Sequence, residues 1–174
     1  LAVIADGENA ANVLGQANFT SSTQATTQSG MNQPSAVALD SGNKRLFVGD
    51  STNNRVLVYD VTTITDGENA ANVLGQSSFT SSTAAATQSG MSGPSYGLAY
   101  DSAAGRLFVG DSTNSRVLVF DMASISDGEN AVNVLGQANF TSSTAATTQN
   151  GMSSARGVAF DSTNKRLYVV EASN

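Results

Sequence analysis

The chain has 174 residues and a mass of 17.7 kDa, which allows one domain with one core, spanning 1–174. It contains no His, Cys or Trp, which excludes Cys or His nucleophile systems, the usual Cys/His zinc site and a disulfide framework. Its formal net charge of −6 has the wrong sign for a phosphate backbone, and no apolar run reaches the roughly 18 residues of a membrane-spanning helix. We therefore expect no nucleic-acid partner and no membrane insertion.

The sequence contains internal repeats. DGENAANVLGQ begins at Asp6 and again at Asp66, and DGENAVNVLGQ begins at Asp127, so successive copies are 60 and 61 residues apart. We divide the chain into repeats 1–60, 61–121 and 122–174, with one extra residue in the second repeat near Tyr96. Regular repetition at this length predicts one supersecondary unit per copy, stacked on its neighbours.

Each full repeat has four short apolar runs separated by turn residues, which predicts four antiparallel strands. An isolated strand of the fourth type is predicted first, over Asn12–Gln16. The second repeat shows the complete set, over Tyr96–Tyr100, Arg106–Gly110, Arg116–Phe120 and Asn133–Gln137. The third repeat stops before its third strand. The chain is therefore either part of a longer chain, or copies of it assemble edge to edge to complete the broken sheet, in a closed ring or a filament.

Both faces of the predicted sheets are apolar. Leu107 and Val109 point to one face of their strand and Phe108 points to the other. A sandwich sheet would be polar on its outer face, so we expect neighbouring copies to cover each sheet on both sides. Four-stranded sheets stacked in this way form a β-propeller. The predicted fold class is an all-β propeller of four-stranded meander blades, with about three blades present and a β-solenoid as the alternative.

The strand motifs resemble the NHL repeat, a family of propeller blades. The pattern P-S-x-x-x-x-D followed by R-L-F-V-G-D-S-x-N-x-R-V-L-V-[YF]-D occurs at Pro34–Asp60 and Pro94–Asp121, and in part at Ala155–Asn174. The third copy departs from it, with Ala155 in place of Pro and Glu171 in place of Asp. The resemblance implies six blades in the family and a general role in binding or scaffolding. It implies no particular ligand, since sites are grafted onto a fold.

Two charged pairs flank the same hairpin turn in successive copies. They are Asp50 with Arg55, and Asp111 with Arg116. One interpretation is a ring of charges on one rim that grips a ligand. The other is that each Asp caps its own turn and pairs with an Arg, each exposed pair contributing under about 1 kcal/mol. We expect the second, because repetition in register is what a structural role predicts.

Other candidate sites are weaker. Asp66, Glu68 and Asn69 of the DGEN loop resemble a fragment of a calcium loop, but calcium takes roughly six to eight oxygens, so we expect a solvated turn and no metal. The innermost strands carry carboxylates only at their ends, at Asp40, Asp101 and Asp161, with no His as base. We therefore expect no cofactor and no catalytic site.

Asn18-Phe19-Thr20 and Asn139-Phe140-Thr141 match the N-glycosylation pattern, so Asn18 and Asn139 are possible glycosylation sites. The hydroxyl-rich stretches that follow are either exposed linkers or carriers of O-linked sugars. We expect the phenylalanines before these stretches to anchor the linkers between blades.

The sequence thus predicts a non-enzymatic extracellular protein that is structural and self-assembling, a building block of a propeller-based surface or filament. Its predicted partners are copies of itself or the rest of a longer chain. A binding propeller, for a carbohydrate, glycan, peptide or protein ligand, is the first alternative. A fragment of a propeller lyase or lactonase is the second.

Overall fold

The computed structural model describes residues 5–173, and within them the protein is all-β and has no α-helix. The strands are β1 (Pro34–Asp40), β2 (Arg45–Asp50), β3 (Arg55–Asp60), β4 (Asn72–Leu74), β5 (Leu98–Asp101), β6 (Arg106–Asp111), β7 (Arg116–Asp121), β8 (Asn133–Leu135), β9 (Ala155–Asp161) and β10 (Arg166–Glu171). The described residues include no helix that could cross a membrane.

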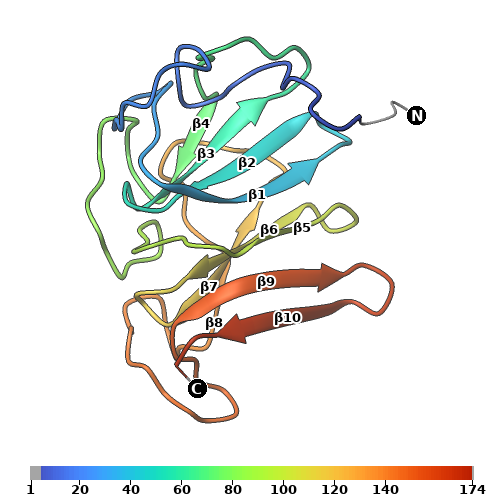
Figure 1. Ribbon diagram of the computed structural model, residues 1–174. Helices are drawn as coiled ribbons and strands as arrows, with labels where there is room; N and C mark the ends of the chain where they lie inside the picture. The colour runs from blue at the N-terminus through green and yellow to red at the C-terminus, as the bar shows by residue number, and fades with distance from the viewer. Residues whose placement is uncertain (1–4, 174) are drawn as a thin grey trace.

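The strands form three antiparallel sheets, each built from strands that are consecutive in sequence (Figure 1). The first sheet has the order β1-β2-β3-β4, the second has the order β5-β6-β7-β8, and the third pairs β9 with β10. Tight hairpin turns require a left-handed residue, which Lys44, Asn54, Ser115 and Lys165 provide with φ between 50° and 55°. The predicted four-stranded meanders are therefore confirmed in the first two sheets.

Three of the predicted strands differ from the structure, and of these the one predicted over Asn133–Gln137 ends earlier, at Leu135. The strand predicted from Tyr96 begins only at Leu98, because Tyr96 at the extra residue takes a φ of 64°. The isolated strand predicted over 12–16 does not form, because these residues have no neighbouring strand within the described chain. An extended segment becomes a strand only where a partner satisfies its backbone hydrogen bonds.

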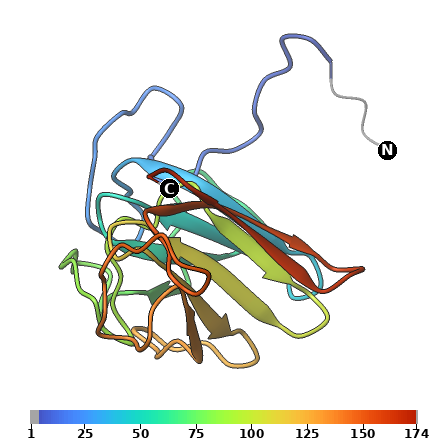
Figure 2. The same ribbon diagram turned by 90° about the horizontal axis from the view of Figure 1, so that it is seen from below.

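The three sheets stack face to face, with the second sheet between the other two (Figures 1 and 2). The same packing occurs at both junctions. The ring of Phe47 on β2 lies 5.6 Å from that of Tyr100 on β5, and the ring of Phe108 on β6 lies 5.3 Å from that of Phe160 on β9. Neighbouring repeats therefore cover the second sheet on both faces, as its apolar pattern predicts.

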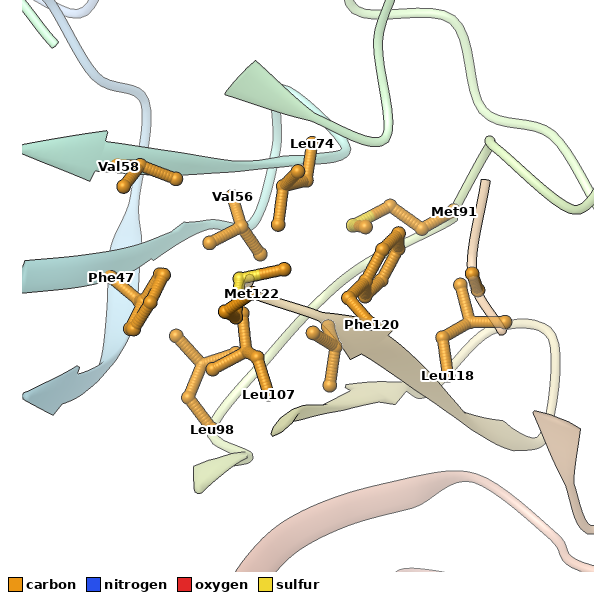
Figure 3. Close-up of a cluster of buried hydrophobic side chains, with 12 residues drawn as sticks. Phe47, Val56, Val58, Leu74, Met91, Leu98, Leu107, Leu118, Phe120 and Met122 are labelled. Atoms are coloured by element: carbon orange, nitrogen blue, oxygen red, sulfur yellow. The ribbon is translucent and has the colours of Figure 1, made fainter. Parts of the chain in front are cut away.

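The largest buried cluster lies between the first two sheets (Figure 3). Its labelled members are Phe47, Val56, Val58, Leu74, Met91, Leu98, Leu107, Leu118, Phe120 and Met122. Burying one such Leu, Val or Phe side chain stabilises the fold by roughly 1.5–3 kcal/mol. A second cluster, which includes Phe108 and Val117, joins the second sheet to the third.

The close approach of the sheets depends on one glycine position. A Cβ atom on Gly49 would lie 2.9 Å from the carbonyl oxygen of Pro94, and one on Gly110 would lie 2.8 Å from that of Arg156. The backbone of the next sheet thus occupies the space that a side chain would need. In the third repeat the same position holds Val170.

The two outer faces of the stack expose apolar side chains. On the first sheet, Val37 and Leu39 of β1 are 65% and 56% exposed. On the third sheet, Tyr168 and Val170 of β10 are 54% and 64% exposed. Their counterparts on the internal faces pack between sheets, so the stack presents one half of its own junction at each end.

Replacing Leu74 by Ala should destabilise the protein much more than replacing Leu135, which holds the same position one repeat later. Leu74 is fully buried between two sheets, whereas Leu135 is 38% exposed. We expect Leu74→Ala to lower the free energy of unfolding by about 2–5 kcal/mol and Leu135→Ala by about 1 kcal/mol. Urea unfolding followed by circular dichroism measures both; equal losses would contradict the stacking described above.

Candidate functional site

Two arginine side chains are completely buried, which is rare for a charged residue. Arg55 begins β3 and Arg116 begins β7, each directly after a hairpin turn. Arg55 Nε donates to Asp50 Oδ2 at 2.8 Å, and Arg116 Nε donates to Asp111 Oδ2 at 2.7 Å. All four side chains have an exposed fraction of 0%. The predicted pairing across each turn is confirmed, and the expectation that the pairs are exposed is wrong.

Backbone carbonyls surround each of these guanidinium groups. Arg55 Nη2 donates to the carbonyls of Thr27, at 3.0 Å, and Gly30, at 2.8 Å, and Nη1 donates to that of Phe79. Arg116 makes the same three bonds to the carbonyls of Thr87, Gly90 and Phe140. We call the carboxylate and its three carbonyls the arginine cradle. The cradle ties one hairpin to the linkers before and after its sheet.

The carboxylate of the cradle is also held from several sides. Asp111 accepts the N–H of Ser92 at 2.7 Å and the side-chain amide of Asn114 at 2.9 Å. Burial raises the pKa of Asp111, while the hydrogen bond from Asn114 and the charge of Arg116 oppose that rise. A ligand in solvent does not reach these atoms, so the geometry favours the structural interpretation of the pair over a ligand-gripping ring.

The third repeat has a matching carboxylate at Glu171. Its Oε2 accepts the N–H of Ser153 at 2.6 Å, and the linkers before the first two sheets donate the equivalent bonds from Asn32 and Ser92 at 2.7 Å each. Thr148 and Gly151 hold the sequence positions of the cradle residues Thr87 and Gly90. The third repeat therefore has a carboxylate that accepts a linker N–H in the same way, and residues of the same type at two of the carbonyl positions. Sequence reasoning noted the exchange of Asp for Glu but missed this arrangement.

The DGEN loops connect successive repeats. Asp127 Oδ1 accepts the backbone N–H of Val73 at 3.1 Å, and the Gly128 N–H donates back to the Val73 carbonyl at 2.9 Å. Asp66 and Gly67 make the same two bonds with Val13, at 3.0 and 3.1 Å. Sequence reasoning expected a solvated turn here and missed this contact. The repetition of Asp-Gly and Asn-Val in every copy was the available signal.

The acidic side chains of each DGEN loop point to different partners. Glu68 Oε2 accepts the N–H of Thr65 within its own loop at 3.0 Å, whereas Asp66 bonds to the preceding repeat. In the described part of the chain, no three acidic residues are placed together to hold a metal ion. The bond from Asp66 to Val13 connects the loop to the preceding repeat.

The aspartates at the ends of the innermost strands cap their own turns. Asp40 accepts two hydrogen bonds from Asn43 and pairs with Arg45 at 2.6 Å, while Asp101 accepts the Ala103 N–H at 3.0 Å. Asp161 likewise accepts the N–H groups of Thr163 and Asn164. Burial raises the pKa of Asp40, but the hydrogen bonds from Asn43 and Arg45 lower it more, from 3.8 to about 2.

The two possible glycosylation sites lie on exposed turns. Asn18 Oδ1 accepts the hydroxyl of Thr20 at 2.8 Å, and Asn139 Oδ1 accepts that of Thr141 at 2.9 Å. Their glycosylation stays a prediction. The expected anchoring by phenylalanine is confirmed for Phe79 and Phe140, which pack against core clusters, and is wrong for Phe19, which is exposed.

Comparison with models of known protein families and with curated proteins gives no match for this sequence. The resemblance to the NHL repeat therefore rests on the strand motifs alone.

Replacing Asp111 by Ala should leave Arg116 buried without its carboxylate. We expect a loss of about 3–5 kcal/mol in the free energy of unfolding, because an unpaired buried charge is costly. Asp121→Ala is the control: Asp121 is exposed and caps the Ala123 N–H at 3.0 Å, so its loss should stay below about 1 kcal/mol. Asp111→Asn, which keeps the shape, serves if the alanine variant fails to fold. Losses as small as that of Asp121→Ala would disprove the cradle's role.

The low pKa of Asp40 predicts a pH dependence of stability. Because its pKa is about 2 in the folded state and 3.8 as the ordinary value, ionised Asp40 stabilises the fold above about pH 4. That contribution disappears as the pH falls from about 4 to about 2. In urea unfolding, Asp40→Asn should flatten the profile in this window. Ser41→Ala, an exposed change in the same turn, should keep the original profile; identical profiles for all three proteins would contradict the assignment.

Proposed function

We propose that this protein is a non-enzymatic structural repeat protein of the extracellular space that assembles with copies of itself. In this proposal the stacked sheets are blades of a propeller-type array, related to the NHL repeat that the strand motifs resemble. Copies join end to end and build a filament or a surface layer.

One observation carries the proposal: the junction between sheets occurs twice, and its two halves are exposed at opposite ends. At the internal junctions an aromatic residue on the second strand packs on the first strand of the next sheet, as Phe47 packs on Tyr100. Tyr168 is the exposed counterpart of Phe47, and Leu39 is the exposed counterpart of Tyr100. When these two different faces bind each other, the assembled copies still expose one free face at each end. Further copies can therefore add, which favours an open assembly.

The uses of the charged residues support a structural role. The buried pairs hold linkers to hairpins, and the DGEN aspartates hold one repeat to the next. The composition supports an extracellular location, with only 13% charged residues. The exposed Asn18 and Asn139 patterns agree with that location and remain candidates for glycosylation.

Val170 makes the proposed junction different from the internal ones. Where Gly49 and Gly110 let a backbone carbonyl approach, the third sheet has a β-branched side chain. A second copy docked in the same way would bring the start of β1, at Pro34, against Val170. Overpacking of this kind costs about 1–3 kcal/mol, so the contact between copies is weaker than the contact within a copy and is reversible.

Replacing Val170 by Gly should strengthen self-association, because it restores the glycine of the internal junctions. We expect the dissociation constant to fall about tenfold, the equivalent of roughly 1.4 kcal/mol. Leu39→Asp should abolish association, because it places an unpaired charge in the contact. Sedimentation velocity over a concentration series, with electron microscopy of the assembled material, measures both effects.

Val132→Ala is the matched control for Val170→Gly. Val132 is also an exposed valine, it lies away from both end faces, and the first two repeats have alanine at its position. It should leave association unchanged. A chain that stays monomeric at every concentration, with or without Val170→Gly, would overturn the proposed function.

A further inference from the structure

Strand β10 has a neighbouring strand on one side only within residues 5–173. In the other two sheets the same edge is occupied, by β3 beside β2 and by β7 beside β6. Both of these third strands read Arg-Val-Leu-Val, then an aromatic residue, then Asp. A sheet edge binds an extended segment through main-chain hydrogen bonds, and pockets for alternate side chains give specificity. The edge of β10 therefore has two templates for its occupant in the same molecule.

The side chain that begins each third strand has a receiving site in the third repeat. Glu171 ends β10 as Asp111 ends β6, and it accepts a linker N–H in the same way. The Thr148 and Gly151 carbonyls correspond to the two that hold Arg116 Nη2 in the second repeat. In the third repeat the Thr148 carbonyl accepts the Gly151 N–H at 3.1 Å. An arginine from an added strand would meet the Glu171 carboxylate, with Thr148 and Gly151 at the sequence positions of the two carbonyl residues.

A hollow beside β8 matches the next side chains of a third strand. Its volume is about 390 Å³, and its lining includes Leu135, Gly136, Gly151 and Met152. One repeat earlier, Leu118 and Phe120 of β7 belong to the cluster that contains Leu74 and Met91, the counterparts of Leu135 and Met152. Figure 3 shows Phe120 lying beside Met91. The hollow therefore corresponds to the place of the leucine and aromatic side chains of an added strand.

We propose that the edge of β10, the Glu171 carboxylate and the hollow beside Met152 form a strand-acceptor site for an Arg-Val-Leu-Val-aromatic segment. The donor is a third-strand segment of another repeat that is not already paired in a sheet, because β3 and β7 of the described chain are each paired on both sides within their own sheets. Its arginine pairs with Glu171, its leucine and aromatic side chains fill the hollow, and its backbone pairs with β10. The origin of the donor rests on the proposed function, whereas binding itself is a property of this chain.

A synthetic peptide with the sequence of residues 54–60, Asn-Arg-Val-Leu-Val-Tyr-Asp, capped at both ends, tests the site. The acceptor is the full chain carrying Leu39→Asp, which lies on the opposite end face and blocks end-to-end contact. Calorimetry should show saturable binding of one peptide per chain. Hydrogen exchange should show new protection of amides in 166–171. The same peptide carrying Arg55→Ala should bind at least about tenfold more weakly, because it cannot form the ion pair with Glu171.

Glu171→Gln removes the negative charge of residue 171 while keeping the shape of its side chain. The amide oxygen still accepts the Ser153 N–H, so the third sheet should stay folded, and the native peptide should bind about tenfold more weakly. The Arg55→Ala peptide should bind the parent chain and Glu171→Gln equally well, since this peptide has no arginine to pair with residue 171. If Glu171→Gln unfolds the third sheet, the role of the ion pair is tested by comparing the native and Arg55→Ala peptides on the parent chain alone.

Three results would overturn the strand-acceptor site: no peptide binding, equal binding of the two peptides, or binding without protection of β10. None of them bears on self-association. Conversely, peptide binding by a chain that never assembles would leave this site standing and remove the proposed function.

Discussion

Apolar side chains on both faces of every sheet are the constraint on which this structure depends. A sheet with one polar face can stand against solvent, but a strand such as β6 places Leu107 and Val109 on one face and Phe108 on the other. Both faces then need a cover, and among the described residues another sheet is the repeated apolar surface that provides it. Stacking follows from this need. The glycine in β2 and β6 follows in turn, because stacked sheets bring a backbone carbonyl against that position.

Stacking of the sheets does not by itself hold the linkers in place. They are rich in Ser, Thr and Ala and carry few large apolar side chains, so they add little hydrophobic burial of their own. The arginine cradle supplies the missing attachment: one guanidinium bonds to two linkers and to its own hairpin at once. A buried ion pair adds little net stability compared with an apolar pair of the same volume. The ion pair contributes specificity instead, because the five N–H donors of a guanidinium have fixed directions and fit only one arrangement of carboxylate and carbonyl acceptors.

The sequence allowed the strands and the stacking to be predicted, because alternation and turn residues are local signals. The burial of Asp50 and Arg55 was not predictable in the same way. Their spacing shows that they meet across a turn, but the carbonyls that bury Arg55 come from residues 24 to 28 positions away. The strand predicted over 12–16 failed for a related reason, since its run of residues matched but no strand of the described chain pairs with it. Long-range contacts decided both outcomes.

The repeats differ from one another at a few positions. Tyr59 and Phe120 occupy one position, and the buried Tyr59 hydroxyl has no hydrogen-bond partner among the described residues, so that hydroxyl is not required by the fold. Val170 and Glu171 are different in kind, because both lie on β10 at positions where the other repeats make contacts between segments. Val170 adds a side chain, where the other repeats have glycine, to the face that would stack on another sheet. Glu171 keeps the carboxylate that would receive an arginine from an added strand. The third sheet has thus lost part of its fit for stacking in the internal geometry and has kept its fit for pairing at its edge. A new repeat that joined this end would therefore be held first by strand pairing and the arginine, and its sheet would pack at a spacing set by Val170.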